Sequence, residues 1–441
     1  MAELNCYLTT FNCAREPINI DFFAANLFNN LKTNLPPDLV VLSLQEVAPI
    51  AYSFLGGQNL TPYFKRFSEA VRRAAQKLPG DENVEYEWVL SRHLGLTGIM
   101  LFARPETVRR IRRIETAGTG VGLWEMGNKG AVGLRLAMDS GSEEVLLTFV
   151  SAHLAPHEDK WERRNMDWKA LNEEMVFSPD EQVSTIPQGR KSTEGEGENE
   201  PLLSSGNDGS GQQDHNEGSL FNPSSHLFIA GDLNYRAADR DPGTLTHLDW
   251  PQPLAEEDNA KTFSALLKND QLSRELNSGK TLHNLAEPDI HFPPTYKYSS
   301  QAKKHAARNA TDPSTSAAQD KNIDHWAPHR FPSWCDRVLH LAAAPPKVHS
   351  YNVLPIQPTS DHRPVAMSFS VPLKPVTAPV KPPYRVVAGY RERRAFARNW
   401  EYLVGWGAYL TLTWEGELVL AGTLVGLVGG WLAVWAFLFW V

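Results

Sequence analysis

Residues 226–236 read HLFIAGDLNYR, an apolar run that ends in two polar residues spaced two positions apart. The apolar part is typical of a buried strand, and Asp232 and Asn234 come directly after it. Side chains two apart in an extended chain lie on one face, so both groups are expected at one strand end. The aspartate can orient or deprotonate a water, and the asparagine can donate to a phosphoryl oxygen. Taken alone, the same string also fits a turn with an Asx cap.

Other predicted strands also begin or end at polar residues, which are Asn12, Glu46, His153, Asp361 and His362. Strand termini on one side of layered sheets form sites, so we expect these side chains to lie together. Carboxylate and amide oxygens without a Cys/His cluster suit Mg²⁺. Asp361 is expected either near the metal or orienting a histidine, and His362 is expected to contact a scissile phosphate.

The order of elements favours an α/β fold in which two sheets pack face to face and are flanked by helices. Strands are predicted over 4–12, 38–44, 86–90, 98–103, 130–137 and 145–152, and helices over 22–33 and 62–77. A chain of 441 residues, 42% of them hydrophobic, has ample core for one large domain or two smaller ones. The net charge of −8 does not favour nucleic acid as a partner, so local basic clusters must meet any anionic substrate.

Two polar stretches are predicted to loop out of a single catalytic domain over residues 1–372. The first, 178–225, is dense in Gly, Ser, Glu, Asn and Gln and predicts a disordered insertion. The second covers 299–321. A Pro-rich and basic linker is predicted over 373–400.

The C-terminal segment 418–441 has no charged residue and is long enough to cross a bilayer core. Four arginines between positions 391 and 398 precede it, as expected for a cytosolic flank. Residues 402–414 are apolar and aromatic, and they predict an interfacial helix or a second, hairpin-like span. The start of the chain lacks the pattern of a signal peptide. We therefore expect a C-terminal tail anchor with the catalytic domain in the cytosol, and the endoplasmic reticulum as the membrane.

A longer series of motifs resembles the inositol polyphosphate 5-phosphatase family, of the exonuclease–endonuclease–phosphatase superfamily with the deoxyribonuclease-I-like fold. The motifs run in family order: TFN (10–12), QE (45–46), GNKG (127–130), SAHLAPH (151–157), RRN (163–165), GDLNYR (231–236), PTYK (294–297), PSWCDR (332–337) and SDHR (360–363). GDLNYR, PTYK and PSWCDR separate the chain from the nucleases and sphingomyelinases that share only the catalytic core. The departures, such as Ala152 and Arg363 where the family often has Ser and Lys, remove no catalytic group.

The resemblance implies metal-assisted hydrolysis by in-line attack of water, without a covalent intermediate. Mg²⁺ would be held by Asn12 and Glu46. The water would be activated by Asp232, and Asn234 would steady the phosphoryl group. The scissile 5-phosphate would be contacted by His153 and His362, with Asp361 supporting the metal or His362.

The resemblance also implies a basic set that holds the ring phosphates, made of Lys129, Arg164, Tyr296, Lys297 and Arg337. Tyr296 and Lys297 would meet the 4-phosphate. With a membrane span, a lipid is favoured over a soluble inositol phosphate, so the expected reaction converts phosphatidylinositol 4,5-bisphosphate to phosphatidylinositol 4-phosphate. The alternatives are a nuclease or phosphodiesterase of the superfamily and a catalytically inactive membrane scaffold or lipid-binding adaptor. The whole resembles small fungal-type, tail-anchored members of the family.

Overall fold

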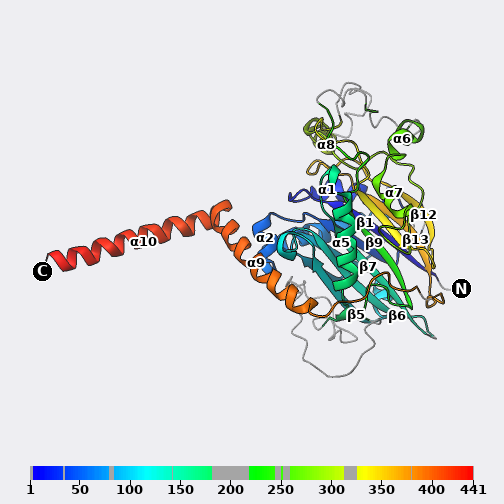
Figure 1. Cartoon of the computed structure of the whole chain (residues 1–441), viewed down its shortest axis with the longest axis horizontal. Coiled ribbons are helices and arrows are strands. Elements are labelled where there is room, and N and C mark those ends of the chain that lie inside the picture. Colours follow the sequence, from blue (N-terminus) through cyan, green and yellow to red (C-terminus); the bar gives the residue numbers. More distant parts are fainter. Residues whose placement is uncertain are drawn as a thin grey trace.

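Two mixed β-sheets packed face to face form the body of the protein, as the computed structural model shows (Figure 1). The structure describes residues 3–32, 35–78, 84–141, 143–180, 218–243, 250–251, 259–311, 325–378 and 380–440. The predicted α/β sandwich is confirmed.

The first sheet has the strand order β12-β13-β1-β2-β4-β3. Its strands are β12 (Lys347–Val353), β13 (Val365–Pro372), β1 (Glu3–Asn12), β2 (Leu39–Gln45), β4 (Thr97–Ala103) and β3 (Glu87–Leu94). β1 runs parallel to β2 with Asn12 opposite Gln45, and antiparallel to β13 with Thr10 opposite Val365. The ends of β1 and β2 and the start of β13 therefore lie at one edge of the sheet.

The second sheet has the strand order β10-β11-β9-β7-β6-β5-β8. Its strands are β10 (Leu285–Ala286), β11 (Asp336–Leu341), β9 (Ser225–Asp232), β7 (Glu144–His153), β6 (Gly130–Asp139), β5 (Ile111–Gly120) and β8 (Ser178–Pro179). In the parallel pair β7–β9, His153 lies opposite Asp232. In the antiparallel pair β9–β11, Asp232 lies opposite Asp336. This register brings His153, Asp232 and Asp336 together at one edge of the second sheet.

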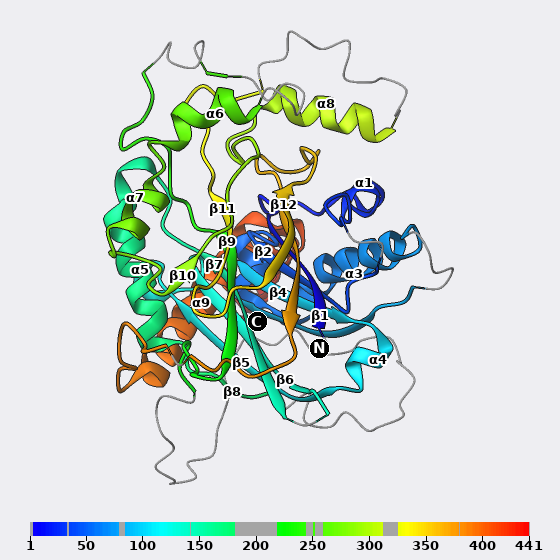
Figure 2. The same ribbon diagram turned by 90° about the vertical axis from the view of Figure 1, so that its right-hand side faces the viewer.

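The central core fills the space between the sheets with side chains from both inner faces. The Phe228 ring of the second sheet stacks on Phe149 of its own sheet, with centroids 5.3 Å apart, and packs at a tilt against Phe369 of the first sheet, with centroids 4.6 Å apart. Helices α1 (Ile20–Asn26) and α3 (Thr61–Ala75) cover the first sheet, whereas α5 (Trp161–Glu174) and α7 (Gln271–Asn277) lie beside the second (Figure 2). The shorter helices are α2 (Ile50–Leu55), η1 (Gly57–Asn59), α4 (Pro105–Val108), η2 (Leu123–Glu125), η3 (Glu158–Lys160) and α6 (Asn259–Leu267).

Both predicted insertions are narrower than the sequence indicated. Residues 181–217 lie outside the described residues, but both flanks of 178–225 belong to the fold, because β8 pairs with β5 and Ser219 bridges Val176. Leu220 and Phe221 are buried in the hydrophobic cluster between the second sheet and α5, so residues 218–225 belong to the folded domain. In 299–321, helix α8 (Ser300–Thr311) forms, and 312–324 lie outside the described residues.

The predicted linker over 373–400 is also corrected, because it ends in helix α9 (Tyr390–Leu412), which packs against α2 and η2. The predicted interfacial segment 402–414 falls mostly within this helix. α10 (Trp414–Phe439) then projects away from the sheets (Figure 1). Among the described residues, α10 is the one helix long and apolar enough to cross a membrane, and its apolar window has no buried residue.

Candidate active site

Asp232 is the centre of a group of side chains at the edge where β1, β7, β9 and β11 meet. Its side chain is almost fully buried, and its Oδ2 accepts a hydrogen bond of 2.9 Å from Asn12 Nδ2. The same oxygen lies 3.3 Å from His153 Nε2 and 3.9 Å from His362 Nε2. Burial would raise the pKa of Asp232, but the two imidazoles outweigh it and hold the pKa far below its usual value. Asp232 is therefore an ionised carboxylate between two histidines.

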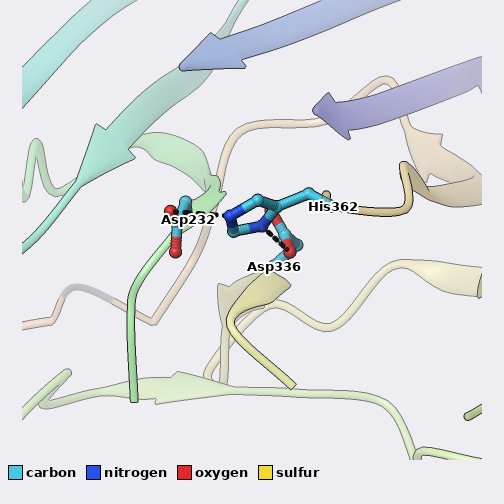
Figure 3. Close-up of side chains that lie close together, drawn as sticks. All are labelled: Asp232, Asp336 and His362. Carbon is cyan, nitrogen blue, oxygen red and sulfur yellow. Dashed lines mark hydrogen bonds and ion pairs between the residues drawn. The ribbon is translucent and has the colours of Figure 1, made fainter. Parts of the chain in front are cut away.

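His362 is held by a second buried carboxylate, Asp336 (Figure 3). Its Nδ1 donates to Asp336 Oδ2 over 2.8 Å, and the Thr295 hydroxyl donates to the same oxygen over 2.7 Å. Burial alone would lower the pKa of His362, but Asp336 and Asp232 outweigh it and raise the pKa to about 9. His362 is therefore an imidazolium at neutral pH, with Nε2 directed toward Asp232.

The carboxylate that is hydrogen-bonded to His362 is that of Asp336, not that of Asp361. Asp361 was expected near the metal or His362, but its Oδ2 pairs instead with Lys297 Nζ at 3.2 Å. Asp336 takes the orienting role. Sequence reasoning included Asp336 within the motif PSWCDR without giving it a role, and only the β9–β11 register brings it opposite Asp232.

Lys129, His153 and Glu46 form the polar side of the site. Lys129 Nζ lies 2.5 Å from His153 Nε2 and 3.6 Å from Glu46 Oε1. Burial lowers the pKa of His153 and the Lys129 charge lowers it further, so the neutral imidazole accepts from the ammonium. Burial would raise the pKa of Glu46, but His153 and Lys129 outweigh it and keep this carboxyl ionised. The other carboxylate oxygen, Glu46 Oε2, lies 3.0 Å from Arg15 Nε.

Asn234 closes the loop after β9 with a backbone φ of 58°, a conformation that asparagine tolerates better than most residues. Its N–H donates to Asp232 Oδ1 over 3.1 Å, and its Nδ2 donates to Leu154 O over 3.1 Å. Its Oδ1 accepts from Arg236 Nη2 over 2.5 Å. One of the two amide hydrogens of Asn234 is thus used to fix the loop beside Asp232.

Tyr296 and Lys297 form the wall next to His362. The ring centroids of Tyr296 and His362 lie 4.4 Å apart. The Arg236 guanidinium also lies over the Tyr296 ring, 4.6 Å from its centroid. The Lys297 side chain is about a quarter exposed, so its ammonium is accessible to solvent beside the site. The structure thus places Tyr296 and Lys297 of the PTYK motif beside His362, and their contact with a ring phosphate stays a prediction.

Both predicted substrate-binding arginines lie inside the protein and have protein partners. Arg164 is fully buried and donates to Ala155 O, His157 O and Gln271 Oε1. Arg337 is 1% exposed and pairs with two carboxylates, those of Asp270 and Glu287. Arg337 follows Asp336 in β11, so its side chain points to the opposite face of the sheet. Both guanidinium groups are therefore engaged inside the fold, and the structure does not bring them to the predicted substrate contact.

The donor set beside Asp232 fits a hard divalent cation. Glu46 and Asp232 are ionised carboxylates, and Asn12 adds an amide, which are the oxygen ligands such a cation takes. Within the described residues, Asp232, Asp336 and His362 also offer ligand atoms within 4.8 Å of one another. His362 Nδ1 and Asp336 Oδ2 are bonded to each other, so the better candidates for a metal are Glu46 and Asn12, with Asp232 beside them.

Residues 9–368 match the model of endonuclease/exonuclease/phosphatase family 2, and the chain belongs to that family. Its curated relatives are named as inositol polyphosphate and phosphoinositide phosphatases, so the resemblance seen in the sequence is confirmed. Type II inositol 1,4,5-trisphosphate 5-phosphatase of Mus musculus is 27% identical over 78% of this chain and 27% of its own length. The polyphosphatidylinositol phosphatase INP53 of Saccharomyces cerevisiae is 26% identical over 76% of this chain and 24% of its own length. The chain thus spans about a quarter of these relatives.

Solved structures confirm the fold. The inositol polyphosphate 5-phosphatase domain of SPsynaptojanin, in complex with inositol (1,4)-bisphosphate and calcium ion, aligns with a TM-score of 0.56. It is 21% identical, and the alignment covers 91% of this chain and 90% of that one. A Cimex nitrophorin aligns with a TM-score of 0.50 at 16% identity, over 84% of this chain and 99% of that one. Because a nitric-oxide-binding protein shares the fold, function has to be argued from the site.

Proposed function

We propose that this protein is a Mg²⁺-dependent phosphoinositide 5-phosphatase that converts phosphatidylinositol 4,5-bisphosphate to phosphatidylinositol 4-phosphate. The observation that carries the proposal is the buried Asp232 carboxylate, with His153 Nε2 at 3.3 Å and His362 Nε2 at 3.9 Å from its Oδ2. The names of the curated relatives support the 5-phosphate as the group removed.

Asp232 and His362 would divide the work of hydrolysis. Because its pKa is held low, Asp232 stays a carboxylate, and it orients the attacking water by accepting a hydrogen bond from it. His362 donates from Nε2 to a phosphoryl oxygen, and Asp336 keeps it protonated and correctly turned. A Mg²⁺ held by Glu46 and Asn12 would neutralise phosphoryl charge and lower the pKa of a bound water.

Lys129 and His153 would exchange partners when a phosphate arrives. His153 Nε2 cannot accept from Lys129 and donate to Asp232 at the same time, although both partners are within 3.3 Å. A phosphate oxygen gives the Lys129 ammonium a better acceptor, because the bond is assisted by charge on both sides. His153 Nε2 can then carry a hydrogen and donate it to Asp232, beside the phosphoryl group. Asn234 steadies the same group with its remaining amide hydrogen.

The 4-phosphate of the lipid would meet the wall formed by Tyr296 and Lys297. Lys297 Nζ is paired with Asp361 at 3.2 Å and is partly exposed, so an incoming phosphate can compete for the ammonium. In this arrangement Asp361 orients Lys297 rather than His362.

The anchor would keep this site at a bilayer. α10 would span the membrane, with the catalytic domain in the cytosol and the endoplasmic reticulum as the proposed location. Exposed Leu403, Trp406 and Leu412 on the second half of α9 support an interfacial position for residues 402–414.

Phosphate release by the full chain in detergent micelles tests the proposal. With Mg²⁺ and phosphatidylinositol 4,5-bisphosphate, we expect phosphatidylinositol 4-phosphate as the lipid product, with turnover lost in a chelator and in Asp232→Asn. A single-stranded DNA substrate and a panel of phosphoinositides serve as comparisons. Release of the 4-phosphate, cleavage of DNA, or no turnover by the folded wild-type chain would refute the proposal.

A further inference from the structure

Helix α9 lies beyond the residues that match the family model, yet it reaches the loop that carries Lys129. Glu401, in the middle of α9, is fully buried and accepts a hydrogen bond of 2.7 Å from the backbone N–H of Gly127. Gly127 is two residues before Lys129, whose ammonium contacts His153 and Glu46. A carboxylate in the membrane-proximal helix is thus joined to the active-site loop by one bond.

Two arginines of the same helix fix the Glu401 carboxylate. Arg394 binds both of its oxygens, over 2.7 and 2.9 Å, and Arg398 Nη1 binds one of them over 3.0 Å. Arg398 Nη1 also donates to Phe54 O over 2.6 Å, which ties the network to α2. Burial would raise the pKa of Glu401, but the Arg394 charge outweighs it and keeps the carboxylate ionised. This network leaves Glu401 little freedom to move.

The same loop is also held by backbone hydrogen bonds to neighbouring turns and strands. Gly127 O accepts from Leu96 N over 3.0 Å, and Val121 N donates to Lys129 O over 2.8 Å. A Cβ at Gly127 would lie 2.9 Å from Gly95 N, so the loop already touches the β3–β4 turn. Around it, Trp400 of α9 stacks on Trp124 with ring centroids 4.4 Å apart. Glu401 provides the bond that holds the loop from the side of α9.

We propose that Glu401 is a positioning residue that sets the place of Lys129 through the Gly127 N–H, which makes the membrane-proximal helix part of the active-site framework. The inference rests on the proposed phosphatase activity. Without the Glu401 bond, the Gly127–Lys129 segment relaxes away from His153, and the Lys129 ammonium meets the phosphate less often. The membrane-proximal helix and the catalytic site are then connected through one buried hydrogen bond and the short Gly127–Lys129 segment, and α9 is more than a tether.

A double-mutant cycle with Lys129 tests this role in the full chain. With phosphatidylinositol 4,5-bisphosphate in micelles and with the water-soluble headgroup, Glu401→Gln is expected to lower kcat/KM by about tenfold. In a Lys129→Ala background the same change is expected to have no further effect, because the residue through which Glu401 acts is gone. Glu401→Asp is the second variant: it keeps the negative charge between the arginines but withdraws it from Gly127, so it also remains usable if Glu401→Gln does not fold.

The control is Tyr52→Phe, which removes a contact of 3.5 Å to Glu415 elsewhere on the α2 side of the anchor and is expected to keep wild-type turnover. The inference is overturned if Glu401→Asp and Glu401→Gln keep wild-type kcat/KM, if they lose turnover only on micelles, or if their losses multiply with that of Lys129→Ala. A wild-type chain without turnover refutes the proposed function instead, so the two failures are distinguishable.

Discussion

Replacing Asp336 with asparagine removes one buried negative charge from beside His362 and keeps the side chain's shape. The wild-type imidazole is 5% exposed and its pKa is raised from 6.5 to about 9, a difference worth ~3 kcal/mol in favour of the imidazolium. Asp336 and Asp232 both contribute to that rise, and Asp336 makes the short bond of 2.8 Å.

The expected magnitude follows from the loss of one charge-assisted hydrogen bond. Such a bond is worth about 1.5–3 kcal/mol, so the pKa of His362 should fall by about one to two units. A group whose folded pKa is raised keeps its proton at low pH and loses it as the pH rises through the folded pKa. Activity that needs the imidazolium therefore persists to about pH 9 in the wild type and is lost at a lower pH in Asp336→Asn. Turnover at its optimum should fall by about 10–100-fold.

The assay is the pH dependence of phosphate release between pH 5 and 10, with folding checked at each end by circular dichroism. Asp361→Asn is the matched control: it removes the neighbouring carboxylate that pairs with Lys297, so it should raise KM and leave the alkaline limb close to that of the wild type. An alkaline limb that stays in place in folded Asp336→Asn would show that His362 does not act as an acid held by Asp336.

Four further changes separate catalysis, stability and membrane binding. Asp232→Asn should lower turnover by about 10²–10⁴-fold without shifting the melting temperature, and a small loss would contradict its role in orienting water. Arg337→Leu should lower the free energy of unfolding by about 3–5 kcal/mol in a thermal or urea melt, because two carboxylates lose their buried partner. Lys297→Ala should instead raise KM with a stability change within about 0.5 kcal/mol, and a reversal of these two effects would refute the assignment of the two residues. Ending the chain at Leu412 should abolish flotation with vesicles while turnover of the soluble headgroup remains, and loss of both would show that α10 also supports the fold.

Much of the site could be predicted because its residues stand at strand ends. Asn12, Glu46, His153 and Asp232 each follow an apolar run, and the β1–β2 and β7–β9 pairs are parallel, so these ends meet at one edge. Local patterns were sufficient for these residues, since which residue ends a strand depends on the neighbouring sequence.

The rest depended on contacts between distant segments. Asp336 and Arg337 are adjacent, and only the register of β11 against β9 decides that the aspartate faces the site and the arginine faces away. The resemblance implied that Arg164 binds substrate, but one of its partners, Gln271 of α7, lies 107 residues away in the sequence, and the sequence alone could not place it there. Residues around Glu401 read as linker and flank, because the partner that orders them, Gly127, lies 274 residues earlier in the chain.

The junction at Thr413 limits which membrane surface the catalytic domain can reach. α9 ends at Leu412 and α10 begins at Trp414, so one residue joins them, and its hydroxyl both donates to Tyr409 O and caps α10 at Gly416 N. A Cβ at Gly416 would lie 2.0 Å from Tyr409 O, so glycine is what allows the two helices to meet this closely. A long flexible tether would let a catalytic domain sweep a volume and reach a neighbouring organelle. With α10 in a bilayer, the one-residue junction between α9 and α10 instead keeps the catalytic domain at the leaflet next to it. Substrate then arrives by lateral diffusion, and the rate depends on the surface density of the substrate lipid.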